Sequence, residues 1–517
     1  MQRGEKYIGM NNRTQKSARN MTVGMVSQLL TILLSFISRT VFIHFLSSEY
    51  LGINGLLANV LTVLSFAELG IADAMTYAMY KPAKEDDRET INKLMILYRK
   101  LYTIIAAVVG GIGLFLSFFI NHIVATPPDI PESLQVIFWF YIVNNMASYL
   151  LTYKKSILIA NQENYIVTSV CQVTAILQQI FQMLILWLTH QYYLYLLIQI
   201  ICTVSNNIGV SVIVKKRYPW LNFHSKEKLP NDTVQSIYKN VKSLSVSKIA
   251  GVISNGADNI IISKLLGLKS VGLVSNYTLV INSLNGVLWS GLSSITSSFG
   301  NFNVDSPINR RRELFDELFL CSYWLYGFLT VGVSVLINPF IELWIGNAYR
   351  VPQSVAASLI LITYISGLNF PVFTYQTTLG MYQKMKYPYL LFGVLNIFLS
   401  VVLGKKFGLI GVYLATSVSR LCTSEVAGGY YVYRDGLQLP PWKYAVKYVL
   451  HFVILIINIV INRLIISNIH ITGIAGFIVK VMICAIVCNL VYLICFHRTK
   501  AFIGLKNRAI GLIKIKG

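Results

Sequence analysis

A stripe of polar side chains that ends in an arginine follows the first long apolar segment of the chain. Thr31, Ser35, Ser38 and Arg39 recur at helical spacing after Ser27, so all five share one face of an α-helix. A charge inside an apolar helix is costly unless it meets water, a partner or a ligand. We therefore interpret Arg39, with Ser38 beside it, as a candidate position in the lining of a site.

A second polar stripe lies 220 positions further along the chain. It includes Asn255, Asp258 and Asn259, which match the end of the first stripe. The first stripe thus carries a cation, Arg39, and the second an acid, Asp258. At a shift of 220, these two residues occupy adjacent positions of the repeat. Two interpretations stay open for Arg39 and Asp258: they form a structural ion pair, or they line an aqueous cavity that receives a substrate.

The other charged residues inside apolar segments include three site candidates, Lys248, Glu68 and Arg420. Lys248 can reach either the membrane surface or the same cavity. Glu68 can carry a proton, cap a helix end or pair with Arg39. Arg420 and Glu425 are close enough in sequence to satisfy each other, or to serve the site.

Several catalytic and cofactor motifs are missing from the sequence. There is no GxxxxGK[ST] phosphate loop, no HExxH and no cysteine spacing typical of a metal site. The segments expected outside the cell are short and leave little room for a catalytic domain. We expect no enzyme and no cofactor, and the residues leave open whether H⁺ or Na⁺ drives the protein. A membrane-bound glycan polymerase or ligase is the enzymatic alternative.

The elements that must position these residues are membrane-spanning helices. Hydrophobic residues make up 55% of the 517 positions and charged residues only 13%, whereas charged residues are about 25% of a soluble domain. We predict an all-α polytopic membrane protein with about fourteen transmembrane helices. The predicted spans are 21–45, 53–80, 94–120, 133–153, 165–188, 193–214, 241–265, 271–299, 315–338, 354–380, 388–404, 409–430, 444–465 and 472–496.

The net charge of +23 is explained by topology. With the N-terminus in the cytosol, 33 of the 44 lysines and arginines fall in cytosolic segments. The outer segments hold only Lys269, Arg350, Lys405 and Lys406. This asymmetry is the positive-inside pattern, so we expect both termini in the cytosol, contact with membrane lipids and no nucleic-acid partner.

The shift of 220 positions also predicts an internal repeat. Six spans separate the two copies, an even number, so the six-helix halves are parallel and a final helix pair is appended. The predicted domains are a cytosolic basic tail (1–20), an N-terminal lobe (21–214), a cytosolic linker (215–240), a C-terminal lobe (241–430), helices 13 and 14 (431–496) and a cytosolic basic tail (497–517).

Four stretches give the chain a family resemblance over roughly residues 15–496. They are RTVFIHFLSSEYLGINGL at 39–56, FAELGIAD at 66–73, DNIIIS at 258–263 with GLVSNY at 272–277, and FGNF at 299–302. In this order and spacing they resemble the bacterial polysaccharide transporters, the Wzx-type oligosaccharide flippases of the multidrug/oligosaccharidyl-lipid/polysaccharide superfamily.

The resemblance implies a bundle of two lobes in the bacterial plasma membrane. It implies movement of undecaprenyl-diphosphate-linked oligosaccharide from the inner to the outer leaflet by alternating access, for capsule, O-antigen or exopolysaccharide synthesis. A polysaccharide polymerase is the protein partner that it suggests. It makes Arg39 the best candidate to meet the diphosphate, and Asp258 matches an acidic position that recurs in the family.

Two other functions in the same superfamily stay open. A cation-coupled multidrug exporter has twelve helices, so the appended pair counts against it. A lipid II flippase has fourteen, but this chain has fewer cavity cations than that substrate leads us to expect.

Overall fold

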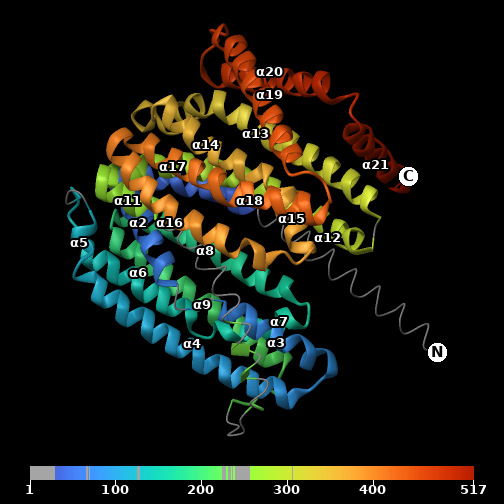
Figure 1. The fold of residues 1–517 in the computed structure, drawn as a ribbon. Helices are drawn as coiled ribbons and strands as arrows, with labels where there is room; N and C mark the ends of the chain where they lie inside the picture. Colours follow the sequence, from blue (N-terminus) through green and yellow to red (C-terminus); the bar gives the residue numbers. More distant parts are fainter. Residues whose placement is uncertain are drawn as a thin grey trace. The chain divides into compact units, whose positions relative to one another are not determined.

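The computed structural model describes residues 29–65, 68, 70–124, 128–223, 229–230, 234–235, 237–238, 241, 257–305 and 307–516, without the side chains of Asp73, 293–305, Tyr382 and 509–516. Helices dominate this part of the chain, and none of its residues lies in a strand (Figure 1). The predicted all-α class is confirmed. The chain divides into two compact units, Met1–Lys269 and Ser270–Gly517.

The first unit begins with the helix Leu29–Phe45, which carries Arg39. It continues with α2 (Ser48–Leu64), α3 (Ile71–Glu85), α4 (Arg88–Ser117), α5 (Ile120–Ile123), α6 (Leu134–Tyr149), the 3₁₀ turn η2 (Thr152–Lys154), α7 (Lys155–Ala160), α8 (Asn164–Thr189), α9 (Tyr192–Arg217) and α11 (Asp258–Leu266).

Helix α4 shows how the sequence builds this unit. Asp87 caps its first turn by accepting a hydrogen bond from the Thr90 N–H at 3.0 Å. The hydrogen bonds from Thr90 lower the pKa of the Asp87 carboxyl. Further along, Leu94, Tyr98 and Tyr102 recur every four residues and are buried in the core. The stripe holds α4 against α3 and α6.

The second unit contains α12 (Leu268–Asp305), α13 (Ile308–Ile345), η3 (Asn347–Tyr349), α14 (Gln353–Leu368), α15 (Phe370–Thr378), α16 (Tyr382–Phe407), α17 (Leu409–Arg420), η4 (Leu421–Glu425), α18 (Val426–Tyr431), η5 (Val432–Gly436), α19 (Trp442–Ser467), α20 (Gly473–Phe496) and α21 (Lys500–Lys516). The η4 and η5 segments are π-helical. Helix α13 packs against α14, α19, α20 and α21. Its buried Phe315, Phe319 and Tyr323 again recur every four residues.

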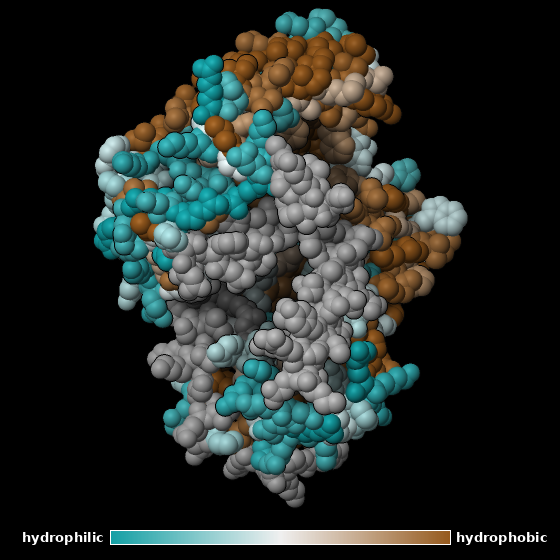
Figure 2. All heavy atoms as spheres, turned by 90° about the vertical axis from the view of Figure 1, so that its right-hand side faces the viewer, coloured by the Kyte–Doolittle hydropathy of each residue, from teal (hydrophilic) through white to brown (hydrophobic). Residues whose placement is uncertain are grey.

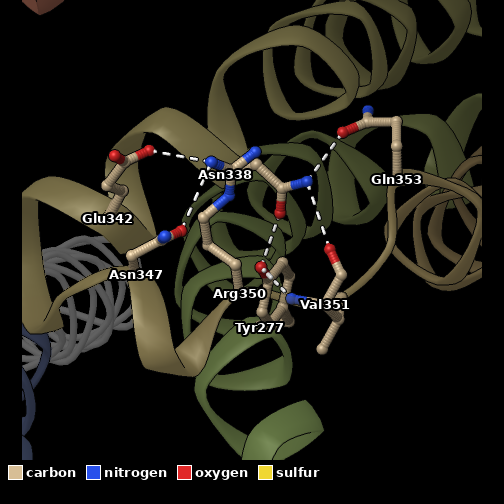
Figure 3. Close-up of polar contacts among 7 residues, drawn as sticks. All are labelled: Tyr277, Asn338, Glu342, Asn347, Arg350, Val351 and Gln353. Carbon is tan, nitrogen blue, oxygen red and sulfur yellow. Dashed lines mark hydrogen bonds and ion pairs between the residues drawn. The ribbon is translucent and has the colours of Figure 1, made fainter.

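An asparagine near the end of α13 holds the following loop in place (Figure 3). The Asn338 amide donates to the Gln353 side chain at 2.8 Å and to the Val351 carbonyl at 3.3 Å. Its oxygen accepts from the Tyr277 hydroxyl at 2.5 Å. That hydroxyl accepts in turn from the Val351 N–H at 3.0 Å. Asn338 is buried, so these bonds satisfy polar atoms that water does not reach.

Long apolar helices identify the environment of both units. Ten described helices are long and apolar enough to cross a membrane. Large apolar side chains are exposed along them, among them Val173, Leu184 and Trp187 of α8. Figure 2 shows broad patches of hydrophobic residues on the face that it draws. Exposed apolar surface of this extent suits lipid, and the chain is a multi-pass membrane protein.

The predicted spans differ from the structure in their continuity. Each of the fourteen ranges overlaps a described helix. The span 53–80, however, is divided between α2 and α3 near Gly70, whose φ is +77°. The span 133–153 is interrupted at Leu151, whose φ is +63°. The tail 497–517 contains a helix, α21. The boundary between lobes at residue 241 stays a prediction, because residues 242–256 lie outside the described part.

Candidate functional site

The helix Leu29–Phe45 turns its polar stripe into the first unit. Thr31 donates to the Gln172 side chain of α8 at 2.7 Å, and the Ser35 hydroxyl donates to the Thr31 carbonyl at 2.7 Å. Ser38 and Arg39 are half-buried. On the opposite side of the helix Leu33 and Ile37 are more than half exposed. The polar face is therefore partly covered by protein.

Tyr195 of α9 is an aromatic residue in the surroundings of Arg39. The two half-buried side chains interact electrostatically. The ring of Tyr195 lies 5.4 Å from that of Phe42, centroid to centroid, and stacks on Tyr192 at 5.8 Å. Phe42 follows Arg39 by one turn, so Arg39 lies at the edge of an aromatic cluster. A cation beside phenol rings and hydroxyls offers groups that bind phosphates and sugars.

Neighbouring tyrosine hydroxyls are held by hydrogen bonds within the unit. The Asn54 side-chain oxygen of α2 accepts from both Tyr141 and Tyr192. Tyr50 donates to Glu132. These bonds tie α2, α6 and α9 together and fix the cluster beside Arg39. The aromatic cluster beside the helix of Arg39 is thus held in a fixed arrangement by α2, α6 and α9.

Asp258 and Asn259 lie at the start of α11, which packs on α2. The Asn259 amide donates to the Gly55 carbonyl at 3.4 Å. A Cβ at Gly52 would lie 2.0 Å from the Leu268 carbonyl oxygen, so only glycine permits this close approach. Asp258 is half-buried in the first helical turn, where a negative charge is favourable.

Glu68 lies in the break between α2 and α3 and contacts α4. Its carboxylate accepts a hydrogen bond from the Tyr102 hydroxyl at 2.6 Å, and Tyr98 donates to Tyr102 at 3.3 Å. Glu68 is half-buried, whereas both tyrosines are buried. A carboxylate and two phenols in series can pass a proton.

Arg420 lies in the second unit and bonds to a neighbouring helix. It donates to the Ser366 hydroxyl of α14, and its guanidinium lies 5.3 Å above the centroid of the Phe392 ring. Glu425 interacts with it electrostatically, yet the Oε2 atom of this buried carboxyl has no hydrogen-bond partner in the described part. The hydrogen bond of Arg420 therefore goes to α14 and not to Glu425.

The site candidates fall into three groups. Arg39, Ser38, Glu68, Asp258 and Asn259 lie in the first unit and Arg420 in the second. Lys248 and Asn255 lie outside the described residues. No cluster of three or more potential metal ligands occurs in the part of the chain searched, which is the described part.

Sequence reasoning missed Tyr195, the neighbour of Arg39. The run Gln191-Tyr192-Tyr193-Leu194-Tyr195 is a visible signal, but tyrosines at a span end are typical of a membrane interface. Only the packing of α9 on the first helix distinguishes a site residue from an interface residue here.

Solved structures that share this fold include a flippase and several transporters, by their descriptions. The lipid II flippase MurJ, in an inward closed conformation, is 14% identical with a TM-score of 0.62 over 91% of this chain and 98% of that chain. An inward-facing multidrug resistance MATE family transporter of the MOP superfamily is 11% identical, with a TM-score of 0.60 over 78% of this chain and 96% of that chain. The Vibrio cholerae MATE transporter VcmN in the bent form is 14% identical, with a TM-score of 0.51 over 83% of this chain and 98% of that one. At these identities the likeness shows a shared fold.

The family is shown by sequence. A comparison with curated proteins finds no match. A family model described as polysaccharide biosynthesis protein matches residues 17–297, more than half of the chain. This range holds Arg39, Glu68, Asp258 and three of the four stretches that carry the resemblance, with the fourth directly after it. The chain therefore belongs to the polysaccharide biosynthesis protein family.

Proposed function

We propose that the protein is a flippase of the bacterial plasma membrane with both termini in the cytosol. It moves undecaprenyl-diphosphate-linked oligosaccharide from the inner to the outer leaflet by alternating access, for the synthesis of a surface polysaccharide. Membrane lipids surround it, and a polysaccharide polymerase uses its product.

The observation that carries the proposal is the place of Arg39. Its guanidinium is half-buried on the polar face of a membrane helix, beside Tyr195 and an aromatic cluster. A diphosphate that leaves water needs a cation with hydrogen-bond donors. The tyrosine rings and hydroxyls suit the first sugar of the same substrate. The polysaccharide biosynthesis family and the fold shared with a lipid II flippase support this assignment.

The energy source proposed is an ion gradient of H⁺ or Na⁺. The chain of Glu68, Tyr102 and Tyr98 is the arrangement in the described first unit that best supports proton coupling. The same observation favours a second function, a cation-coupled multidrug exporter. An exporter predicts altered drug susceptibility on deletion with unchanged surface polysaccharide, and the flippase predicts the reverse.

The role of Arg39 is tested by substitution in a deletion strain. Arg39→Ala should lower surface polysaccharide per unit of membrane-inserted protein about tenfold or more, because it removes a charge-assisted pair of hydrogen bonds. Protein level and detergent stability should stay nearly unchanged. Arg39→Lys should retain part of the activity, since the charge persists without the planar fork. Full activity of Arg39→Ala would defeat the proposal.

A charge exchange separates substrate binding from a structural ion pair. If Arg39 and Asp258 only attract each other, the double variant Arg39→Asp/Asp258→Arg should restore both folding and transport. If Arg39 binds phosphate, the double variant should stay inactive, because the cation has moved to another helix.

A further inference from the structure

A cationic groove lies on the first unit, away from Arg39. It runs between α4, the broken end of α6 and α9, and its volume is about 500 Å³. Its lining includes Arg99 and Thr103 of α4, Lys154 of η2, Val204 and Ile208 of α9, and Phe223. Tyr102 of the proposed coupling chain also lines the groove, but neither that chain nor the stripe of Arg39 requires these cations.

The break after α6 creates the groove. Asn207 of α9 is buried, and its amide donates to the carbonyls of Ala147 at 2.9 Å and Leu150 at 2.7 Å. Both carbonyls lie where α6 ends and Leu151 adopts a positive φ, and the Ala147 carbonyl also accepts from the Leu150 N–H at 3.2 Å. The chain then turns and brings Lys154 beside α9.

Three positive charges meet at this point. Lys154 interacts electrostatically with both Arg99 and Lys215. Among the described residues, no carboxylate forms an ion pair with any of the three. The nearby carboxylate of Glu163 is bound to Arg217 at 2.8 Å. Like charges this close repel one another, so an anion between them would be stabilising.

Lys154 is held in the groove. Its ammonium donates to the Ser211 hydroxyl of α9 and lies 5.6 Å above the Phe223 ring. Its side chain is half-buried, while Arg99 is exposed at the rim. The ammonium still has donor capacity after one hydrogen bond, which a phosphate oxygen can use.

The groove borders apolar surface on the side of α9. Val204 and Ile208 are 38% and 49% exposed, and Leu150 is 51% exposed. They belong to segments apolar enough to cross a membrane. An occupant must therefore combine a negative headgroup with an apolar chain.

We propose that this groove binds an anionic membrane phospholipid. The phosphate lies between Arg99 and Lys154, Lys215 adds to the positive field, and an acyl chain follows Val204 and Ile208. Basic pockets between transmembrane helices are suited to such headgroups, and each cation near the membrane surface adds roughly a fivefold gain in affinity. The inference does not depend on which glycan the protein carries.

The experiment compares lipid binding by two charge-matched double variants of the full chain. Arg99→Gln/Lys154→Gln removes the groove cations, and Lys100→Gln/Lys155→Gln removes their immediate neighbours in sequence, which do not line the groove. Phosphatidylglycerol is titrated against phosphatidylcholine and binding is followed by native mass spectrometry. Wild type and the control should prefer phosphatidylglycerol, and the groove variant should bind it roughly 30-fold more weakly. Equal loss in both variants would overturn the proposal.

A third variant keeps the charges and fills the space. Thr103→Trp places a large ring in the groove from an exposed position of α4, so it should also lose the preference while the protein stays monodisperse. If Thr103→Trp and the groove variant both bind phosphatidylglycerol like wild type, the proposal fails. It also fails if inorganic phosphate alone displaces all of the bound phosphatidylglycerol. A polyprenyl diphosphate that displaces phosphatidylglycerol equally from wild type and from the groove variant would contradict it too, because binding would then not depend on the groove cations.

Discussion

At the scale of single residues, the bond between Tyr102 and Glu68 joins α4 to the break after α2. Tyr102→Phe removes the donor at 2.6 Å and leaves the half-buried carboxylate without it. We expect the free energy of unfolding to fall by about 1–3 kcal/mol. Tyr98→Phe is the matched control, because the bond from Tyr98 to Tyr102 is longer, at 3.3 Å. Melting in detergent measures both variants, and equal losses would contradict the assigned roles.

The Asn338 network makes a second prediction at this scale (Figure 3). Asn338→Ala leaves the Tyr277 hydroxyl without its acceptor and the Gln353 side chain without its donor. The protein should lose about 2–3 kcal/mol of stability, because buried polar atoms lose their partners. Asn347→Ala, in the same figure, changes an exposed side chain on the rim of the loop and should lie within about 0.5 kcal/mol of wild type. A melting curve of Asn338→Ala that matches that of Asn347→Ala would refute the network.

Arg39 and its neighbours show what the sequence predicts at this scale. That Thr31, Ser35 and Arg39 share one face follows from helical period alone, which is local information. That Tyr195 lies beside Arg39 depends on the packing of two helices more than 150 positions apart. No local pattern carries such a contact.

At the scale of elements, hydropathy predicted the spans but not their breaks. It averages over about 20 residues, so it cannot detect one residue with positive φ such as Gly70 or Leu151. Glu68 lies in the first of these breaks and Lys154 shortly after the second. Both breaks depend on the chain's tertiary contacts. The basic tail 497–517 was predicted from its charge, and its helix was missed, although Phe502 and Leu505 pack on the core of the second unit.

Helix α21 is held to α13 by an ion pair. The Arg508 guanidinium lies 2.5 Å from the carboxylate of Glu317, which is 4% exposed. Phe502 stacks on Trp324 with ring centroids 5.8 Å apart. Arg508→Ala leaves Glu317 without this partner, so we expect α21 to detach. Hydrogen exchange in 500–516 should increase severalfold, while Lys506→Ala, at an exposed position, should leave it unchanged. Unchanged exchange in Arg508→Ala would show that the ion pair does not hold the helix.

At the scale of the whole molecule, the internal repeat stays a prediction. Helices α8 and α16, from corresponding spans of the predicted halves, both contain 26 residues, and each is followed by one residue with positive φ, His190 or Gly408. We predict that the two six-helix halves superpose without inversion, with Asn20 matched to Asn240. The register itself lies outside the described residues. A first span that matches the seventh only after inversion would contradict it.

The charge pattern predicts the orientation of the chain in the membrane. Cysteines introduced at Lys155 and Arg311 should react with an impermeant thiol reagent only after permeabilisation, and one at Lys406 should react in intact cells. The native exposed cysteines, Cys422 and Cys495, are replaced first. Labelling of the variant at 311 without permeabilisation would show that the chain has the opposite orientation in the membrane. The proposed direction of transport would then be wrong as well.

The most direct test of the account is translocation of the proposed substrate by the purified protein. Proteoliposomes carry undecaprenyl-diphosphate-linked oligosaccharide in one leaflet, and a membrane-impermeant glycan-modifying enzyme reports its arrival in the other. We expect wild-type protein to expose the glycan and Arg39→Ala, equally folded and equally incorporated, to do so about tenfold more slowly or worse. Translocation by Arg39→Ala at the wild-type rate, or none by folded wild-type protein under either an H⁺ or a Na⁺ gradient, would contradict it.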